Sequence, residues 1–95
     1  MDIQQKIKDN RGSFFIEIDG QQVAEMAFTL RGEGVMSIDH TDVDESLKGQ
    51  SVGKKLLDHV VAYAQEQHLK IKPYCTFAKA MFEKNKEKYA DLVIF

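Results

Sequence analysis

Several residue types that mark whole classes of protein are scarce or missing in this chain. It has one cysteine, one proline and no tryptophan. A single cysteine cannot form an internal disulfide, which fits a reducing compartment. No apolar run approaches the eighteen or so residues that a membrane helix needs, and the polar first ten residues do not fit a signal peptide. These absences predict a cytoplasmic protein with no membrane partner.

The chain also has no long run of residues with the same sign of charge. The 95 residues include 13 basic and 15 acidic side chains, for a net charge of −2. This balance does not favour nucleic acid as a partner. The three histidines and the cysteine are scattered singly, so no metal site is expected. Length and an apolar content of 43% predict a single packed domain over residues 1–95.

Alternating apolar residues in the first half predict an antiparallel meander. Strands are expected over residues 3–8, 14–18, 21–30 and 35–43, and the Asp19-Gly20 pair is a strong two-residue hairpin signal. The expected fold class is therefore α+β, because a helical pattern follows.

The helical period begins at Val52 and continues to about residue 67. Its apolar face comprises Val52, Leu56, Leu57, Val60, Val61 and Ala64. A short strand is expected over residues 70–75, at an edge or splayed, because Pro73 donates no ladder hydrogen bond. A short second helix is expected from about Thr76, which is a suitable N-cap. We expect an apolar tail to pack on the core: Tyr89, Leu92, Val93 and Phe95.

A loop of small residues, Lys48 to Gly53, leads into the first helix. Such a loop gathers unpaired backbone N–H groups at the positive end of the helix dipole, an arrangement typical of phosphate sites. The spacing of Gly49 and Gly53 excludes a nucleotide P-loop, in which Lys55 would have to be a hydroxyl residue, and the dinucleotide fingerprint is absent. The alternative is a helix start whose glycines only form a turn.

The loop resembles the pyrophosphate loop of the GNAT (GCN5-related) acyltransferases, with the pattern Arg/Gln-x-x-Gly-x-Gly/Ala. Lys48, Ser51 and Gly53 take its three fixed positions. Three ordered blocks extend the resemblance over most of the chain: Ile38-Asp39-His40-Thr41, Gly49 to Leu56, and Pro73 to Phe77. The chain is similar to a small single-domain GNAT subfamily. It lacks the two early helices that usually wall the acceptor groove, so we expect an acceptor site that is open or borrowed from a partner.

The resemblance implies coenzyme A carrying an acyl group, most simply acetyl, as ligand, with the acyl end near Cys75. The pyrophosphate would lie on the N–H groups of residues 50–54, and the pantetheine arm would pair with the backbone of residues 41–43 in a gap between splayed strands. Lysines of the loop and helix would neutralise phosphate charge. The residues expected to bind the coenzyme are Thr41, Asp42, Val43, Lys48, Gly49, Gln50, Ser51, Val52, Gly53, Lys54 and Lys55.

Two chemistries remain open for the acyl group. An acceptor amine attacks the thioester directly, with His40 as the candidate base, or Cys75 takes the acyl group first. Cys75 precedes a helix N-terminus, a position that lowers a thiol pKa. Asp39 is not expected to orient His40, because successive strand residues face opposite ways. A buried filler cysteine and a structural histidine are the alternatives.

The predicted function is acyl-CoA-dependent N-acetyl transfer to an amine. The main alternative is a non-catalytic acyl-CoA-binding module that acts as a sensor or subunit, and another is an interaction domain whose loop binds no phosphate. The acceptor is open between a small amine, a polyamine and a protein lysine. The length of the acyl chain is open too, and a monomer or weak dimer is expected.

Overall fold

Tight turns fold the first half of the chain into an antiparallel meander, as expected. In the computed structural model, which describes residues 2–95, both central residues of the second turn have positive φ, 52° at Asp19 and 79° at Gly20. Such values are those of a type I′ turn, whose twist matches that of the flanking strands. The four strands of the meander are β1 (Gln4–Lys8), β2 (Arg11–Ile18), β3 (Gln21–Gly32) and β4 (Val35–Val43).

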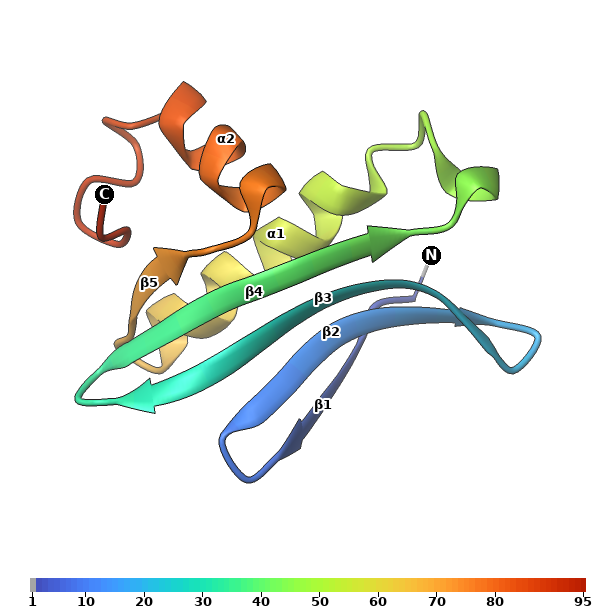
Figure 1. Ribbon diagram of the computed structural model, residues 1–95, viewed down its shortest axis with the longest axis horizontal. Helices are drawn as coiled ribbons and strands as arrows, with labels where there is room; N and C mark the ends of the chain where they lie inside the picture. The colour runs from blue at the N-terminus through green and yellow to red at the C-terminus, as the bar shows by residue number, and fades with distance from the viewer. Residues whose placement is uncertain (1) are drawn as a thin grey trace.

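A helical crossover then adds a fifth strand in the parallel direction. After a 3-10 turn, η1 (Glu45–Leu47), comes helix α1 (Val52–Glu66), and strand β5 (Lys70–Pro73) returns beside β4. A parallel neighbour requires such a crossover because the chain must return to the same end of the sheet. The strand order is β1-β2-β3-β4-β5, and helix α2 (Thr76–Lys84) follows (Figure 1).

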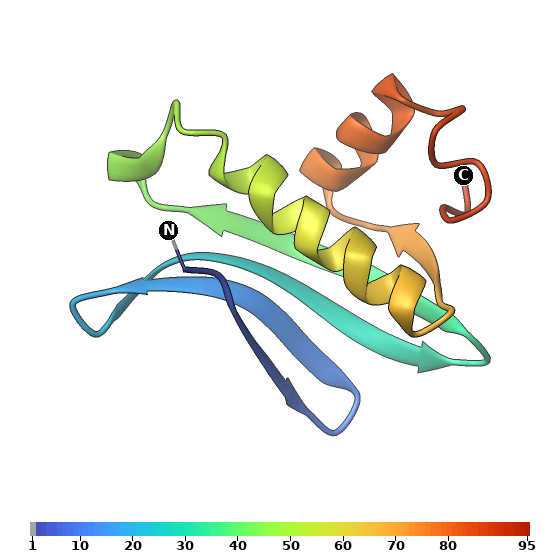
Figure 2. The same ribbon diagram turned by 180° about the vertical axis from the view of Figure 1, so that it is seen from behind.

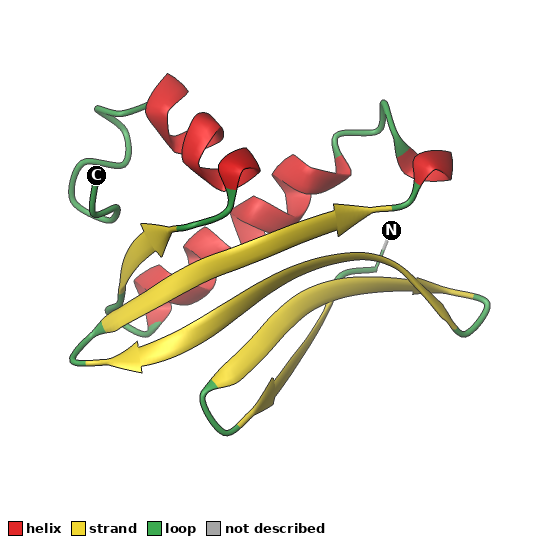
Figure 3. Ribbon diagram, in the orientation of Figure 1, coloured by secondary structure: helices red, strands yellow, loops and turns green. Residues whose placement is uncertain are grey.

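The two helices lie on one side of the sheet. Figure 2 shows α1 crossing the sheet diagonally with α2 beside it, and Figure 3 distinguishes the helices, in red, from the strands of the sheet, in yellow. This arrangement confirms the α+β class. We call the helix-covered side of the sheet the inner face and the other side the outer face.

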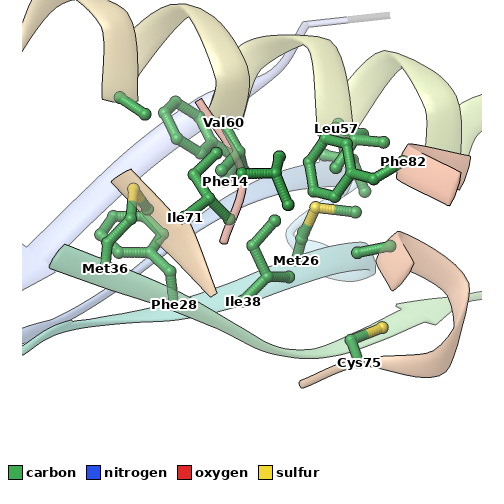
Figure 4. Close-up of a cluster of buried hydrophobic side chains, with 14 of the residues drawn as sticks. Phe14, Met26, Phe28, Met36, Ile38, Leu57, Val60, Ile71, Cys75 and Phe82 are labelled. Atoms are coloured by element: carbon green, nitrogen blue, oxygen red, sulfur yellow. The ribbon is translucent and has the colours of Figure 1, made fainter. Parts of the chain in front are cut away.

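The core lies between the inner face and α1. The α1 residues Leu56 and Val60 are fully buried, and the strands contribute large side chains to the same cluster (Figure 4). Each such burial contributes roughly 1.5–3 kcal/mol, so the amphipathic face of α1 is the main force holding it on the sheet. The strand residues of the cluster include Phe14, Ile16, Met26, Phe28, Met36, Ile38 and Ile71.

The structure corrects three details at the C-terminal end. Strand β5 ends at Pro73, and Cys75 rather than Thr76 is the N-cap of α2. Tyr89, Leu92 and Val93 pack on the core as expected, and Val93 forms a parallel bridge to β5. Phe95, however, is half exposed. One bridge is enough to hold the backbone of the tail there, but it does not bring the last ring inside.

Gly12 permits the close approach of β1, β2 and a core ring. A Cβ at this position would lie 2.5 Å from Cζ of Phe28 and 2.8 Å from the backbone oxygen of Lys6. We predict that Gly12→Ala lowers the free energy of unfolding by about 1–3 kcal/mol, because a buried ring and a strand must both shift. Urea unfolding measures this change.

The neighbouring residue provides a matched control. The Ser13 hydroxyl is buried and has no hydrogen-bond partner within residues 2–95. Ser13→Ala removes that unsatisfied group, so we expect stability unchanged within about 0.5 kcal/mol or slightly increased. Similar losses from both substitutions would contradict the steric explanation for Gly12.

Candidate active site

Strands β4 and β5 part halfway along β4. They pair only over residues 35–38 of β4, and the chain turns away after Pro73. At this point the carbonyl oxygen of Ile38 accepts two backbone N–H bonds, from Tyr74 and Cys75, each at 3.0 Å. Beyond it, β4 continues to Val43 with pairing to β3 alone. Residues 39–43 therefore have a free backbone edge facing the gap.

A cavity of about 340 Å³ opens beside this free edge. Segments that are distant in the sequence meet around it: the end of β4, the small-residue loop, the start of α1 and the start of α2. Its lining residues are Thr41, Val43, Leu47, Lys48, Gly49, Ser51, Val52, Gly53 and Phe77. Seven of the eleven residues that the sequence predicts for the coenzyme thus surround one cavity, and Asp42, Gln50, Lys54 and Lys55 do not line it.

The loop backbone turns sharply at two places. Gly49 has φ of 85°, and Ser51, the N-cap of α1, has φ of 57° and makes no side-chain capping bond. A left-handed serine costs on the order of 1 kcal/mol. Four other non-glycine residues share this conformation, all at turns. The first N–H groups of α1, at residues 52–54, have no acceptor within the helix. Gln50 differs from the prediction, because its N–H donates to the Leu47 carbonyl at 3.3 Å.

Asp44 anchors the chain where it enters this loop. Its carboxylate accepts bonds from the backbone N–H and the hydroxyl of Ser46, at 2.9 and 2.8 Å. These two bonds hold the pKa of Asp44 below its ordinary value, the backbone bond being the larger cause. The Asp44 N–H also donates to the Val23 carbonyl of β3 at 2.8 Å. The start of the loop is thereby tied to the sheet.

Gly53 and Phe77 bring the two helix starts together. A Cβ on Gly53 would lie 2.8 Å from Cζ of Phe77, so the ring rests directly on the first turn of α1. Phe77 is partly exposed and lines the cavity rather than the core. The glycine therefore serves close packing here, in addition to forming the loop.

Three lysines surround the loop on its solvent side. Lys48 pairs with Glu45 at 2.9 Å and Lys54 with Asp58 at 3.5 Å, both as exposed pairs. Exposed pairs of this kind contribute little to stability, so they can exchange partners easily. Lys55 is exposed and forms no ion pair within the described part of the chain. Positive charge is therefore available at the rim of the cavity.

Cys75 lies at the vertex where β4 and β5 part. It is 8% exposed, caps α2 and sits at the edge of the core cluster (Figure 4). Its Sγ is 3.2 Å from the hydroxyl of Thr41, a residue that lines the cavity. The structure thus brings Thr41 and Cys75 together across the gap.

Comparisons with known proteins show the family to which this chain belongs. The model of the GCN5-related N-acetyl-transferase family matches residues 13–92. This chain belongs to that family. It is also similar to a GCN5-like candidate N-acetyltransferase from Staphylococcus aureus solved by NMR, at 39% identity and a TM-score of 0.72, over 96% of this chain and 87% of that one. The match confirms the family that the sequence predicts. The general chemistry of this family is N-acetyl transfer, and the acceptor stays open.

Two solved structures of lower sequence identity show a likeness in fold alone. An aminoglycoside N-acetyltransferase solved with CoA has 14% identity and a TM-score of 0.66, over 87% of this chain and 88% of that one. A ribosomal-protein-alanine N-acetyltransferase from Brucella melitensis has 18% identity and a TM-score of 0.63, over 93% of this chain and 64% of that one. No curated protein sequence matches this chain.

The outer face of this GCN5-related fold carries His40, on the other side of β4 from Thr41. A β-bulge causes this placement: Ile38 pairs with Phe28 and His40 with Ala27, so Asp39 is an extra residue. The bulge corrects the expectation of strict alternation, because Asp39 and His40 both face outward. His40 is 58% exposed, and its Nε2 lies 3.6 Å from the Glu25 carboxylate. The structure does not bring it to Cys75.

Asp39 joins a polar cluster on the outer face. Its carboxylate accepts bonds from the hydroxyls of Thr29, at 2.6 Å, and Ser37, at 2.7 Å. Arg31 donates to the Ser37 hydroxyl at 2.9 Å and lies 3.6 Å from the carboxylate. The same guanidinium stacks on the Tyr74 ring at 5.4 Å. The cluster thus links the bulge in β4 to the segment that carries Cys75.

The sequence patterns did not single out the cluster or the position of Phe77. The alternation places Thr29 and Ser37 among ordinary outward strand residues, the pattern predicts Arg31 in the turn after residue 30, and it predicts Phe77 in the core. The only available signal for the cluster was the number of polar residues that two neighbouring strands place on one face.

The described residues give no sign of a metal centre. Within residues 2–95 no three His, Cys, Asp or Glu side chains form a group that could hold a metal ion. In that same range neither helix is long and apolar enough to cross a membrane.

The Asp39 cluster predicts a measurable loss of stability. Asp39→Ala leaves the buried hydroxyls of Thr29 and Ser37 and the Arg31 guanidinium without their acceptor. We expect it to lower the free energy of unfolding by about 1–3 kcal/mol. Asp39→Asn keeps one acceptor oxygen and should lose clearly less. If chemical denaturation shows both variants as stable as the wild type, the carboxylate does not hold the bulge.

Proposed function

We propose that this chain binds acetyl-CoA in the cavity beside β4 and transfers the acetyl group to an amine. One observation carries the proposal: the loop, the free edge of β4 and the start of α2 meet around a single cavity, with Cys75 behind its wall. A turn that served only to connect β4 to α1 would not require a free strand edge and a glycine against a ring at one place.

The start of α1 suits the pyrophosphate of the coenzyme. The N–H groups of Val52, Gly53 and Lys54 lack helical acceptors, and the dipole of α1 adds positive potential. Lys48 would exchange Glu45 for a phosphate, while Lys54 and Lys55 add charge from the rim. Gln50 takes no part through its N–H, which is already bonded.

The free edge of β4 suits the pantetheine arm. Amides of an extended chain add to an exposed strand edge by pairing with its backbone. Residues 39–43 offer such an edge on the side that β5 has left. Asp42 would contribute only backbone groups, because it pairs with Glu25 on the outer face.

Transfer by the direct route needs few groups. The amine nitrogen bonds to the thioester carbon, the carbon–sulfur bond breaks, and the coenzyme sulfur leaves with the electron pair. The proton lost by the amine passes to a base. His40 can take this proton only from an acceptor that arrives over the outer face, where it stands beside Glu25. N–H groups left unpaired by the bulge and the free edge would hold the oxyanion.

The surroundings of Cys75 favour the direct route of acetyl transfer. The thiol is buried and engaged with the Thr41 hydroxyl, so it lies behind the cavity wall and does not line the cavity itself. In the covalent alternative its sulfur would displace the coenzyme thiol, and the amine would then attack the acetyl-cysteine. Both routes give the same products and differ in the intermediate.

A non-catalytic acyl-CoA module is the second candidate. The observation that favours it is the direct turn at residues 9–10 between β1 and β2, which leaves no helix on the outer face before η1 in the described range. The acceptor side of the sheet is therefore open. Coenzyme binding without any turnover would support this candidate.

Gly53→Asp tests the coenzyme site. The added carboxylate would face the pyrophosphate, and like charges in contact cost several kcal/mol, so the affinity for acetyl-CoA should fall at least about tenfold. Amide NMR titration measures it, with wild-type shifts expected at residues 41–43, 48–55 and 75. Gly53→Ala is the control, because it makes the same contact with Phe77 without the charge. Equal affinity in the two variants, or no wild-type shifts at millimolar ligand, would contradict the proposal.

Cys75→Ala separates the two routes. By the direct route the variant should keep acetyl transfer within about tenfold of the wild type, since it loses one wall contact and no bond-forming atom. Mass spectrometry of wild-type protein with acetyl-CoA alone should find no acetyl group on Cys75. Cys75→Ser, which keeps a polar partner for Thr41, is the matched control. A loss of more than a hundredfold in both variants, with acetyl on wild-type Cys75, would establish the covalent route.

A further inference from the structure

A second cavity lies on the other side of α2. Its volume is about 360 Å³, and it is bounded by the end of β5, the outward side of α2 and the C-terminal tail. Helix α2 divides the two cavities: Phe77 lines the one beside β4, while Lys79 lines this one. We call it the tail cavity.

The floor of the tail cavity is apolar and exposed. Tyr74, Ile94 and Phe95 line it and are 56%, 39% and 51% exposed. They are three of only six large apolar side chains in the described range that are exposed at all. Isolated exposed apolar residues are ordinary, but a group that lines one concavity is typical of a binding site.

The rim of the tail cavity is cationic. Lys72 and Lys79 line it and form no ion pair within residues 2–95, and Lys86 lies 5.1 Å above the Phe95 ring. Glu83 is the only acidic residue in the lining. Such a rim attracts anions and repels polyamines.

The distribution of basic and acidic residues along the chain also favours the binding of an anion in the tail cavity. Residues 70–95 carry six lysines and three acidic side chains, whereas residues 1–69 carry seven basic and twelve acidic side chains. The protein as a whole is weakly acidic, yet its C-terminal quarter is basic. An anionic ligand would therefore be directed toward the tail cavity and away from most of the sheet.

The tail cavity borders the vertex at which the acetyl group is expected. Tyr74 lies between Pro73, another lining residue, and Cys75, and its backbone N–H binds the same Ile38 carbonyl as that of Cys75. Arg31 stacks on the Tyr74 ring from the outer face. A ligand in the tail cavity is thus held on a segment whose next residue, Cys75, contacts Thr41 in the wall of the cavity beside β4.

We propose that the tail cavity recognises the acceptor, and that the acceptor carries a carboxylate and an apolar side chain close to its amine. The inference rests on the proposed function. The lysines at the rim would bind the carboxylate, the apolar floor would bind the side chain, and the amine would point toward the vertex. A free apolar amino acid and a peptide whose amino-terminal residues combine an apolar and an acidic side chain present the same chemistry.

Paired acceptors test the carboxylate. Coenzyme release from acetyl-CoA is compared for phenylalanine and phenylalaninamide. It is also compared for a short peptide that begins with phenylalanine followed by two glutamates and for its counterpart with two lysines. One or two partly exposed lysine–carboxylate contacts should raise kcat/KM of the anionic member about three- to tenfold. The pair in which the anionic member is preferred shows whether the acceptor is a free amino acid or a peptide. A preference for the neutral or cationic members would overturn the proposal.

Charge reversal on α2 tests the location. Lys79→Glu should abolish or invert the preference for the anionic acceptor. Lys84→Glu makes the same charge change on the same helix outside the tail cavity and should keep it. If both variants behave alike, the carboxylate does not bind in the tail cavity.

A binding measurement tests acceptor recognition by the tail cavity without relying on turnover. The acidic peptide is titrated into labelled protein with and without acetyl-CoA, and shifts are expected at Lys72, Tyr74 and Lys79. Peptide shifts there without coenzyme shifts at residues 48–55 would leave the tail cavity intact and refute the coenzyme site. No peptide shifts at millimolar concentration would overturn the acceptor proposal while the coenzyme site stands.

Discussion

One backbone carbonyl determines how the second half of this protein is arranged. The Ile38 oxygen accepts the N–H groups of Tyr74 and Cys75 together, so pairing between β4 and β5 ends there and the chain after Pro73 turns into α2. The proline contributes because it has no N–H with which to continue the ladder. The free edge of β4, the contact between Thr41 and Cys75, and the approach of α2 to the start of α1 all depend on this early parting of two strands.

A second constraint acts from the opposite side of the sheet. The bulge at Asp39 turns one extra side chain outward, and Thr29, Ser37 and Arg31 hold it there. Without the bulge, the alternation along β4 would place Thr41 outward, away from Cys75. The polar cluster on the outer face and the thiol contact on the inner face are therefore parts of one geometry.

The sequence predicted those parts of the site that depend on local chemistry. Turns such as Asp19-Gly20, the apolar face of α1 and the small-residue loop are encoded within a few neighbouring residues, so periodicity and spacing were enough. The bulge was not predictable, because one inserted residue leaves the apolar pattern of β4 almost unchanged. The ring of Phe77 on Gly53 and the grouping of lysines around the tail cavity arise only when segments from different elements pack together.

The two faces of β4 also restrict how a transfer reaction can proceed here. Thr41 and Cys75 lie on the inner side with the proposed coenzyme site, whereas His40 and Glu25 lie on the outer side. A reaction that uses both must take place at the edge of the strand, in the gap that β5 leaves open. The coenzyme thiol would then leave toward the inner cavity while the proton of the amine leaves toward the outer face. An open outer face is consistent with this division, because the acceptor needs access to one side of the gap only.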